Sequence, residues 1–148
     1  MKTIGMGKIN LPSDVEFYED VRLLVHRPRG TLNKATVSRI VAVVGELEYS
    51  LREPFNRFFD TVGADEVDLN FEYMIHISLY RRCVYAGRPP IKSAILAKDS
   101  TVIHYARLHA VLTQGSPINV RVFQDRKEAA QWLGVPIATL MADADQHD

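Results

Sequence analysis

Three things are scarce in this sequence: cysteine, excess charge and long apolar runs. Cys83 is the one cysteine in 148 residues, so no intramolecular disulfide can form, as is typical of a reducing compartment. Lysine and arginine together number 18, as do aspartate and glutamate, so no positive surplus favours a nucleic-acid backbone. No apolar run reaches the roughly 18 residues of a membrane span, and the first residues lack the apolar core of a signal peptide. We therefore expect a cytoplasmic protein that has no transmembrane segment and binds no nucleic acid.

The motifs of several common enzyme classes are missing as well. The sequence contains no Gly-x-Gly-x-x-Gly, P-loop, Gly-x-Ser-x-Gly or His-Glu-x-x-His, which excludes the usual nucleotide, hydrolase and metalloprotease sites. His104 and His109 are five residues apart, whereas shared ligation from one helix face prefers three or four. We expect both to face solvent or to pack at an edge. We predict no metal, no cofactor and no enzymatic activity.

One basic segment deserves a separate hypothesis. His26, Arg27 and Arg29 lie together at the end of a predicted strand. They could hold an anion, but solvated charges near a strand end are the interpretation that we favour.

Composition indicates one compact domain spanning residues 1–148. Apolar residues make up 47% of the chain and charged residues 24%, as in an ordinary globular protein. We place the packed core at residues 15–134. Residues 1–12 form a loose lead-in, and the small, acidic tail 136–148 is expected to fray.

Strand and helix patterns alternate along this core. Strands are predicted at residues 15–17, 21–26, 55–59, 91–97 and 118–123. Helices are predicted from a cap at Asn33 to Pro54, then over 68–85, 101–112 and 125–133, the last capped by Asp125. Alternation favours an α/β fold, with a mixed, mostly parallel sheet of about five strands packed against about four helices. The first two strands are expected to pair antiparallel at one edge.

The acidic residues Asp60, Asp65, Glu66 and Asp68 fall within nine positions before the second predicted helix. They could form a cation site or an acidic patch that faces a partner. Acidic residues also favour the positive end of a helix, and we favour this role, with Asp68 as the cap.

Two segments resemble a known family. Residues 58–68 (FFDTVGADEVD) are similar to its strand, Asp-x-x-Gly loop and helix start, and residues 120–133 (VRVFQDRKEAAQWL) to its last strand and helix. The family is that of the STAS domains (the sulfate-transporter and anti-sigma-factor-antagonist group), and the chain is closest to its SpoIIAA-like branch. The resemblance implies a bacterial regulatory or scaffold module that binds a protein partner.

In the anti-sigma antagonists, a serine or threonine at the start of the second helix is phosphorylated, which switches partner binding. The corresponding stretch here is Asp68-Leu69-Asn70-Phe71. Leu69 and Asn70 occupy the hydroxyl positions, and neither accepts a phosphate. The resemblance therefore implies the architecture and a partner surface around this helix start, without the switch.

The second predicted helix carries two apolar stripes, where a surface helix usually has one. Phe71, Met74, Ile75, Ser78, Leu79 and Cys83 form the stripe that we expect to be buried. Tyr73, Ile77, Tyr80 and Val84 form the other, which is either a wide core contact or a protein interface, for example of a homodimer. Together with the preceding polar residues, the hypothetical partner-binding set is Asp65, Glu66, Asp68, Asn70, Tyr73, Ile77, Tyr80 and Val84.

An alternative from another class remains open. The SpoIIAA-like branch also resembles the lipid-binding domain named after Sec14, which implies a carrier or sensor of a small apolar ligand or lipid. Its expected sign is a closed apolar cavity of about 300 Å³ or more between the sheet and the helices.

Overall fold

A five-stranded sheet forms the centre of the molecule in the computed structural model, which describes residues 2–3 and 10–142. The strands in spatial order are β3 (Val15–Tyr18), β4 (Leu23–His26), β6 (Asn56–Asp60), β8 (Ile91–Leu96) and β9 (Ile118–Phe123). β3 pairs with β4 antiparallel, and every later pair is parallel. The predicted mixed, mostly parallel sheet with an antiparallel first pair is confirmed.

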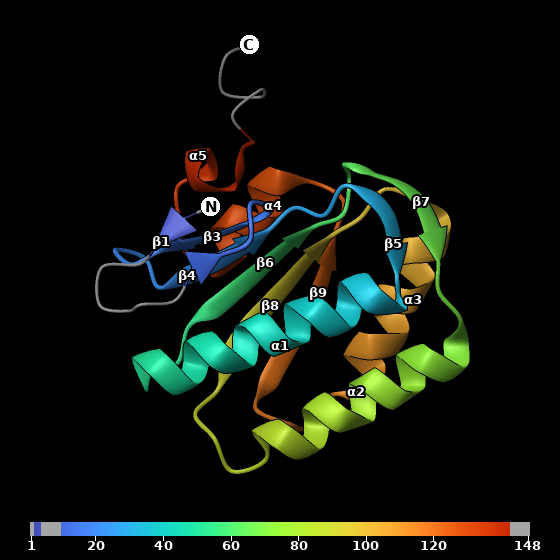
Figure 1. Ribbon diagram of the computed structural model, residues 1–148, viewed down its shortest axis with the longest axis horizontal. Coiled ribbons are helices and arrows are strands. Elements are labelled where there is room, and N and C mark those ends of the chain that lie inside the picture. The colour runs from blue at the N-terminus through green and yellow to red at the C-terminus, as the bar shows by residue number, and fades with distance from the viewer. Residues whose placement is uncertain (1, 4–9, 143–148) are drawn as a thin grey trace.

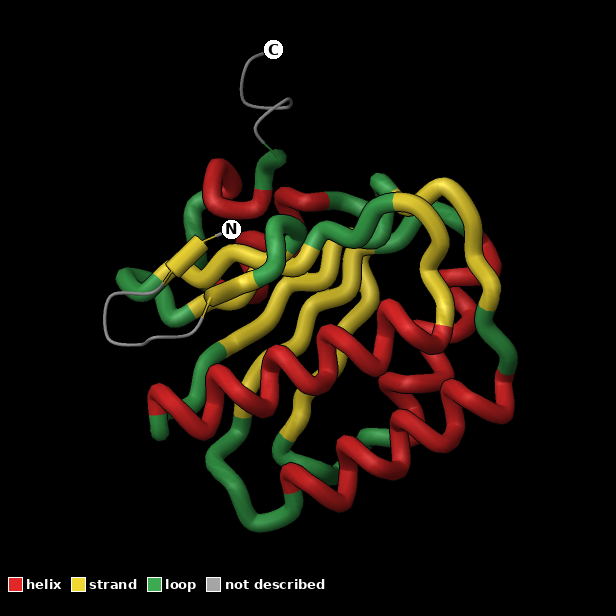
Figure 2. The backbone as a smooth tube through the Cα atoms, in the orientation of Figure 1, coloured by secondary structure: helices red, strands yellow, loops and turns green. Residues whose placement is uncertain are grey.

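Helices cover both faces of this sheet. They are α1 (Lys34–Leu51), α2 (Phe71–Tyr85), α3 (Ser100–Leu112), α4 (Arg126–Leu133) and the short α5 (Ile137–Leu140). α4 and α5 pack on one face through Ala129, Leu133 and Leu140, whereas α1 packs on the other through Ile40 and Leu47. α1 runs across that second face, and α2 lies beside α1 (Figure 1 and Figure 2). No helix in the described residues is long and apolar enough to cross a membrane.

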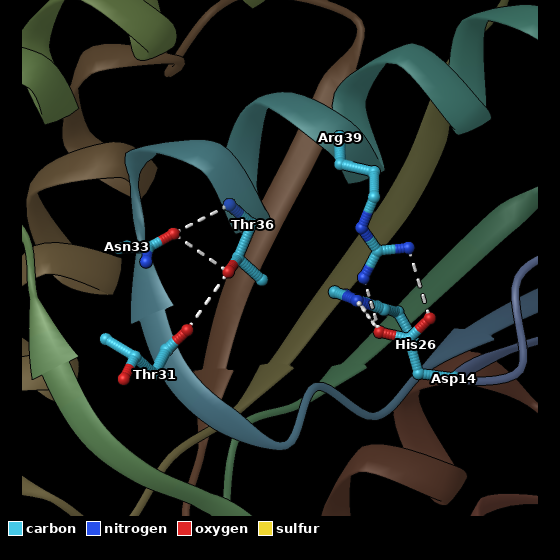
Figure 3. Close-up of polar contacts among 6 residues, drawn as sticks. All are labelled: Asp14, His26, Thr31, Asn33, Thr36 and Arg39. Atoms are coloured by element: carbon cyan, nitrogen blue, oxygen red, sulfur yellow. Dashed lines mark hydrogen bonds and ion pairs between the residues drawn. The ribbon is translucent and has the colours of Figure 1, made fainter.

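Side-chain caps start four of the helices. Asn33 accepts a hydrogen bond from the backbone N–H of Thr36, as Figure 3 shows, and Asp125 accepts one from that of Lys127. Both predicted caps are confirmed. α2 is capped by Asn70 and not by Asp68, because the chain stays extended through Asp68 and the helix begins at Phe71.

A second, small sheet was not predicted. β5 (Gly30–Asn33) and β7 (Ala64–Asp68) pair in parallel beside the main sheet. β7 contains three acidic residues, which are uncommon in strands. Because acidic residues are common just before a helix, the sequence predicted a helix start here instead of a strand. The pairing is supported by Leu32 and Val67, which pack with α3.

The chain ends add to the packed core beyond the segment 15–134. β1 (Lys2–Thr3) and β2 (Asn10–Leu11) form a short antiparallel pair, and Leu11 is fully buried against α1. Residues 137–140, predicted to fray, instead form α5 with Leu140 fully buried. Residues 143–148 of the predicted tail lie outside the described residues.

Candidate functional site

A cavity of about 670 Å³ lies between α1, α2, α3 and the sheet. Most of its wall is aliphatic or aromatic. The apolar lining includes Leu32, Val37, Ile40, Val41, Val44, Phe59, Leu69, Met74, Ile77, Val84, Ile95, Val102 and Ala106. Such a wall, with a few polar groups at defined places, is typical of a small-molecule site.

The mouth of the cavity lies where the carboxyl-terminal halves of α1 and α2 face solvent. Gly45, Tyr49 and Arg52 belong to α1 or its end, and Tyr80 and Arg88 to α2 or the following loop. All five are exposed. The cavity is therefore open at this side, whereas the predicted sign was a closed cavity.

A buried arginine lies beside the cavity, in hydrogen bonds with Glu48 and Tyr85, which line it. Arg57 on β6 is fully buried, and its Nη2 donates to Glu48 Oε2 at 2.6 Å and to the Tyr85 hydroxyl at 3.0 Å. Tyr85 in turn donates to Glu48 Oε1 at 2.5 Å. The Nε and Nη1 atoms of Arg57 are buried without a hydrogen-bond partner. Strand alternation puts Arg57 on the same sheet face as Phe59, which lines the cavity.

A hydrogen-bonded chain links α2 to α3 beside this group. Arg81 Nη1 lies 3.0 Å from His109 Nε2, and His109 Nδ1 lies 2.7 Å from Ser78 Oγ. Arginine can only donate, so His109 accepts at Nε2 and carries its proton on Nδ1, from which it donates to Ser78. The Ser78 hydroxyl then donates to the Met74 carbonyl at 2.7 Å. His109 is thus held as the neutral imidazole.

Burial and neighbouring charges shift the pKa values of three of these groups. Burial lowers the pKa of His109 to about 3, and the neighbouring Arg81 lowers it further in the same direction. Burial together with the charge of Arg57 lowers the pKa of Arg81 to about 10. Burial raises the pKa of Tyr85. At neutral pH Arg81 is therefore charged, while His109 and Tyr85 are neutral.

A second polar group faces the cavity from its other end. His26, at the end of β4, is buried, and its Nε2 donates to Asp14 Oδ2 at 3.2 Å. Arg39 of α1 forms an ion pair with the same carboxylate at 2.6 Å (Figure 3). Burial lowers the pKa of His26 to about 4, although Asp14 opposes this shift. In this group the charges of Asp14 and Arg39 compensate for each other, and His26 is neutral at neutral pH.

The predicted partner-binding residues fall in different environments. Asp65, Glu66 and Asp68 are exposed on β7, and Asn70 is the α2 cap. Asp60, which the sequence placed in the same acidic group, is buried and paired with Arg126 at 2.8 Å and Arg27 at 3.7 Å. The predicted acidic group therefore does not form one patch: Asp60 is buried in ion pairs, and the other three acidic residues are exposed on β7.

The remaining members of that set lie along α2. The Tyr73 hydroxyl donates to the Lys34 carbonyl and lies 2.7 Å from Ser38 Oγ, which ties α2 to α1. Ile77 is buried, Val84 is half-buried, and Tyr80 is 50% exposed; all three line the cavity. Their role in partner binding stays a prediction.

The predicted buried stripe of α2 is wrong in most of its members. Phe71, Ile75, Leu79 and Cys83 are exposed. The buried residues of α2 are Met74, Ile77, Ser78, Arg81 and Tyr85. Both sets recur at helical spacing, and the packing of α2 against α3 decides which of them faces inward.

Two predictions about basic groups are also wrong. His109 is not at the surface, because α2 packs over it and supplies both of its hydrogen-bond partners. His26 and Arg27 are not solvated, because they pair with Asp14 and with Glu16 and Asp60. Only Arg29 of that segment is exposed. No cluster of metal-ligating side chains occurs among residues 2–3 and 10–142.

The sheet order and the helices on its two faces define a SpoIIAA-like α/β fold. The resemblance found in the sequence is therefore confirmed for the fold. A solved structure that shares it is an uncharacterized protein of the DUF3478 family, from Shewanella loihica PV-4. The two chains are 15% identical, the match covers 80% of this chain and 90% of the other, and the TM-score is 0.51. At this identity the likeness concerns the fold alone. No protein-family model and no curated protein sequence matches this chain.

Proposed function

We propose that this protein binds a small apolar or amphipathic ligand in the cavity between α1, α2 and the sheet. The observation that supports it is the cavity of about 670 Å³ with its aliphatic wall. Ligand sites commonly have volumes of about 300–1,000 Å³, whereas packed interiors contain few voids larger than a water molecule. Compared with a protein-binding module, the carrier or sensor of an apolar ligand is thus the better supported function.

An obstruction at the mouth tests this proposal. Gly45 lines the cavity, and a Cβ built on it meets no atom within 4 Å. Gly45→Phe therefore extends a ring into open space with little strain elsewhere. Ala42→Phe is the matched control, since Ala42 is exposed on the same helix and does not line the cavity.

The assay is uptake of a neutral fluorescent probe, N-phenyl-1-naphthylamine, excited directly, together with native mass spectrometry of freshly purified protein. We expect the wild type and Ala42→Phe to take up the probe, and Gly45→Phe to bind it at least tenfold more weakly. A co-purifying lipid mass further supports the proposal. If all three proteins bind the probe equally, or none does, this cavity is not a ligand site.

A second candidate function is that of a non-enzymatic regulatory or scaffold module that binds a protein partner, including a second copy of itself. One observation favours it: Phe71, Ile75 and Leu79 are 57%, 42% and 46% exposed, and they recur every four residues along α2. A row of exposed apolar side chains is the kind of surface that protein interfaces bury.

Leu79→Glu tests the second candidate, because Leu79 does not line the cavity. His76→Glu is its control, at an exposed polar position of the same helix. If α2 is an interface, Leu79→Glu lowers the sedimentation coefficient and His76→Glu leaves it unchanged. A wild-type protein that sediments as a monomer at all concentrations, and captures no partner, contradicts this candidate.

A further inference from the structure

The polar end of the cavity has more positive than negative charge. The guanidinium carbons of Arg57, Arg81 and Arg88 lie 5.1, 6.0 and 5.1 Å from the centre of the Tyr85 ring. Glu48 is the one carboxylate that pairs with any of them in the described residues, at 2.6 Å from Arg57 and 3.9 Å from Arg88. Three cations therefore share one anion, and two of the three, Arg57 and Arg81, are buried.

Arg81 has the most unusual surroundings of the three. It is 92% buried, and a buried charge is strongly unfavourable unless an opposite charge compensates for it. Its polar contact with α3 is the neutral imidazole of His109. Within the part of the chain that the structure describes, no carboxylate lies at ion-pair distance from Arg81; Glu48 favours its charged form from further away, and Tyr85 favours it as well.

His109 orients Arg81 without neutralising it. Because Ser78 fixes the proton of His109 on Nδ1, Nε2 remains an acceptor that holds one N–H of Arg81. A carboxylate at this place would orient Arg81 equally well, but it would also cancel the positive charge. Arg81 lines the cavity, so its charge acts on whatever occupies that space.

We propose that Arg81 and Arg88 bind the anionic headgroup, a carboxylate or a phosphate, of an amphipathic ligand whose apolar tail lies in the cavity. This inference rests on the proposed ligand-binding function and adds the chemical class of the ligand. Guanidinium groups bind both kinds of anion through charge-assisted hydrogen bonds. Arg88 stands at the mouth with its side chain 48% exposed, so the headgroup lies near solvent, and Val41, Val44 and Ile77 provide contacts for the tail.

Three ligands with the same twelve-carbon tail test the proposal: dodecanoate, dodecyl phosphate and dodecanol. Binding to the wild-type protein is measured by isothermal titration calorimetry at pH 7.5, below the concentrations at which micelles form. We expect the anions to bind at least tenfold more tightly than dodecanol, because charged hydrogen bonds contribute more than neutral ones. The ratio between dodecanoate and dodecyl phosphate then identifies the preferred headgroup.

Arginine substitutions locate the anion site. Arg81→Met keeps an unbranched side chain that fills most of the arginine stem and removes the charge, and it should lower dodecanoate affinity at least tenfold while dodecanol affinity changes less than threefold. Arg107→Met on exposed α3 surface is the matched control and should change neither affinity. If Arg81→Met does not fold, Arg88→Met replaces it, since a half-exposed side chain is less important for folding.

The outcomes separate this inference from the function on which it rests. If dodecanol binds as tightly as both anions, or Arg81→Met and Arg88→Met keep the full preference for anions, the anion site is wrong and the apolar cavity stands. If none of the three ligands binds, the ligand-binding function itself fails.

Discussion

Mild acid should destabilise this protein through two buried histidines. Burial lowers the pKa of His109 to about 3, with Arg81 acting in the same direction. Burial also lowers the pKa of His26 to about 4; Asp14 opposes the shift and Arg39 adds to it. In the unfolded chain a histidine titrates near pH 6.5. Between pH 6.5 and 4, therefore, the unfolded chain takes up protons at both positions while the folded protein does not.

The sign and the size follow from proton linkage. Where the unfolded state binds more protons, stability falls as the pH falls. Each histidine then removes close to 1.4 kcal/mol for every pH unit below 6.5, so that lowering the pH to 5 costs about 2 kcal/mol per residue and about 4 kcal/mol for both. Above about pH 7.5 neither histidine contributes to the pH dependence. The lowered pKa of the Asp14 carboxyl stabilises the folded protein at all pH values above its ordinary value of 3.8, and this contribution is lost only as the pH falls below 3.8.

Urea unfolding at pH 7.5, 6.5, 5.5 and 5.0 measures this dependence. His109→Gln is the informative variant, because glutamine can accept from Arg81 and donate to Ser78 but does not titrate. It should remove about half of the loss between pH 6.5 and 5, and His26→Gln should remove most of the rest. A wild-type stability that is flat over this range, or an unchanged slope in the double variant, would refute the assignment of two buried neutral histidines.

Three further substitutions test the structure itself through urea or thermal unfolding. Gly45→Ala should stabilise the protein by about 0.5–1 kcal/mol, because glycine is unfavourable inside a helix and the added Cβ meets no atom within 4 Å; a loss of stability contradicts the geometry of α1. Asn33→Ala should cost about 1 kcal/mol through loss of the α1 cap, and Asn33→Asp should restore most of it. Leu140→Ala should cost about 3 kcal/mol because Leu140 is fully buried; an effect below about 0.5 kcal/mol would show that α5 does not pack on the sheet.

The fold was largely predictable because its main elements have simple local signals. The alternating strand at residues 118–123 and the helix capped by Asn33 appear where the sequence places them. Strands β5 and β7 escaped prediction because their pairing partner is about 34 residues away and β7 is rich in acidic residues. Their stability comes from contacts with α3 through Leu32 and Val67, which no local pattern reveals.

Prediction of the site from α2 failed for a different reason. Residues 71–85 carry apolar side chains on nearly every side, so helical spacing is satisfied by an inner and an outer set at the same time. A better signal was present in the charged residue Arg81. It lies four positions after Ile77 and four before Tyr85, hence on the buried face of α2, most of which packs against α3. A buried arginine needs an opposite charge to compensate for its own. Arg81 lines the cavity, so an anion bound there could supply that charge.

The rest of the site could not be found from spacing at all, because four elements contribute to it. Glu48 comes from α1, Arg57 from β6, Arg81 from α2 and His109 from α3, and no short motif joins them. Their arrangement also argues that the cavity is more than a defect of packing. Apolar side chains that line an open cavity lack the packing contacts of a filled core, and a buried guanidinium with no carboxylate at ion-pair distance in the described residues is unfavourable. The apolar tail of the proposed ligand would fill the cavity, and its anionic headgroup would compensate for the charge of Arg81. Because one ligand would meet both needs, we treat the cavity and Arg81 as one site.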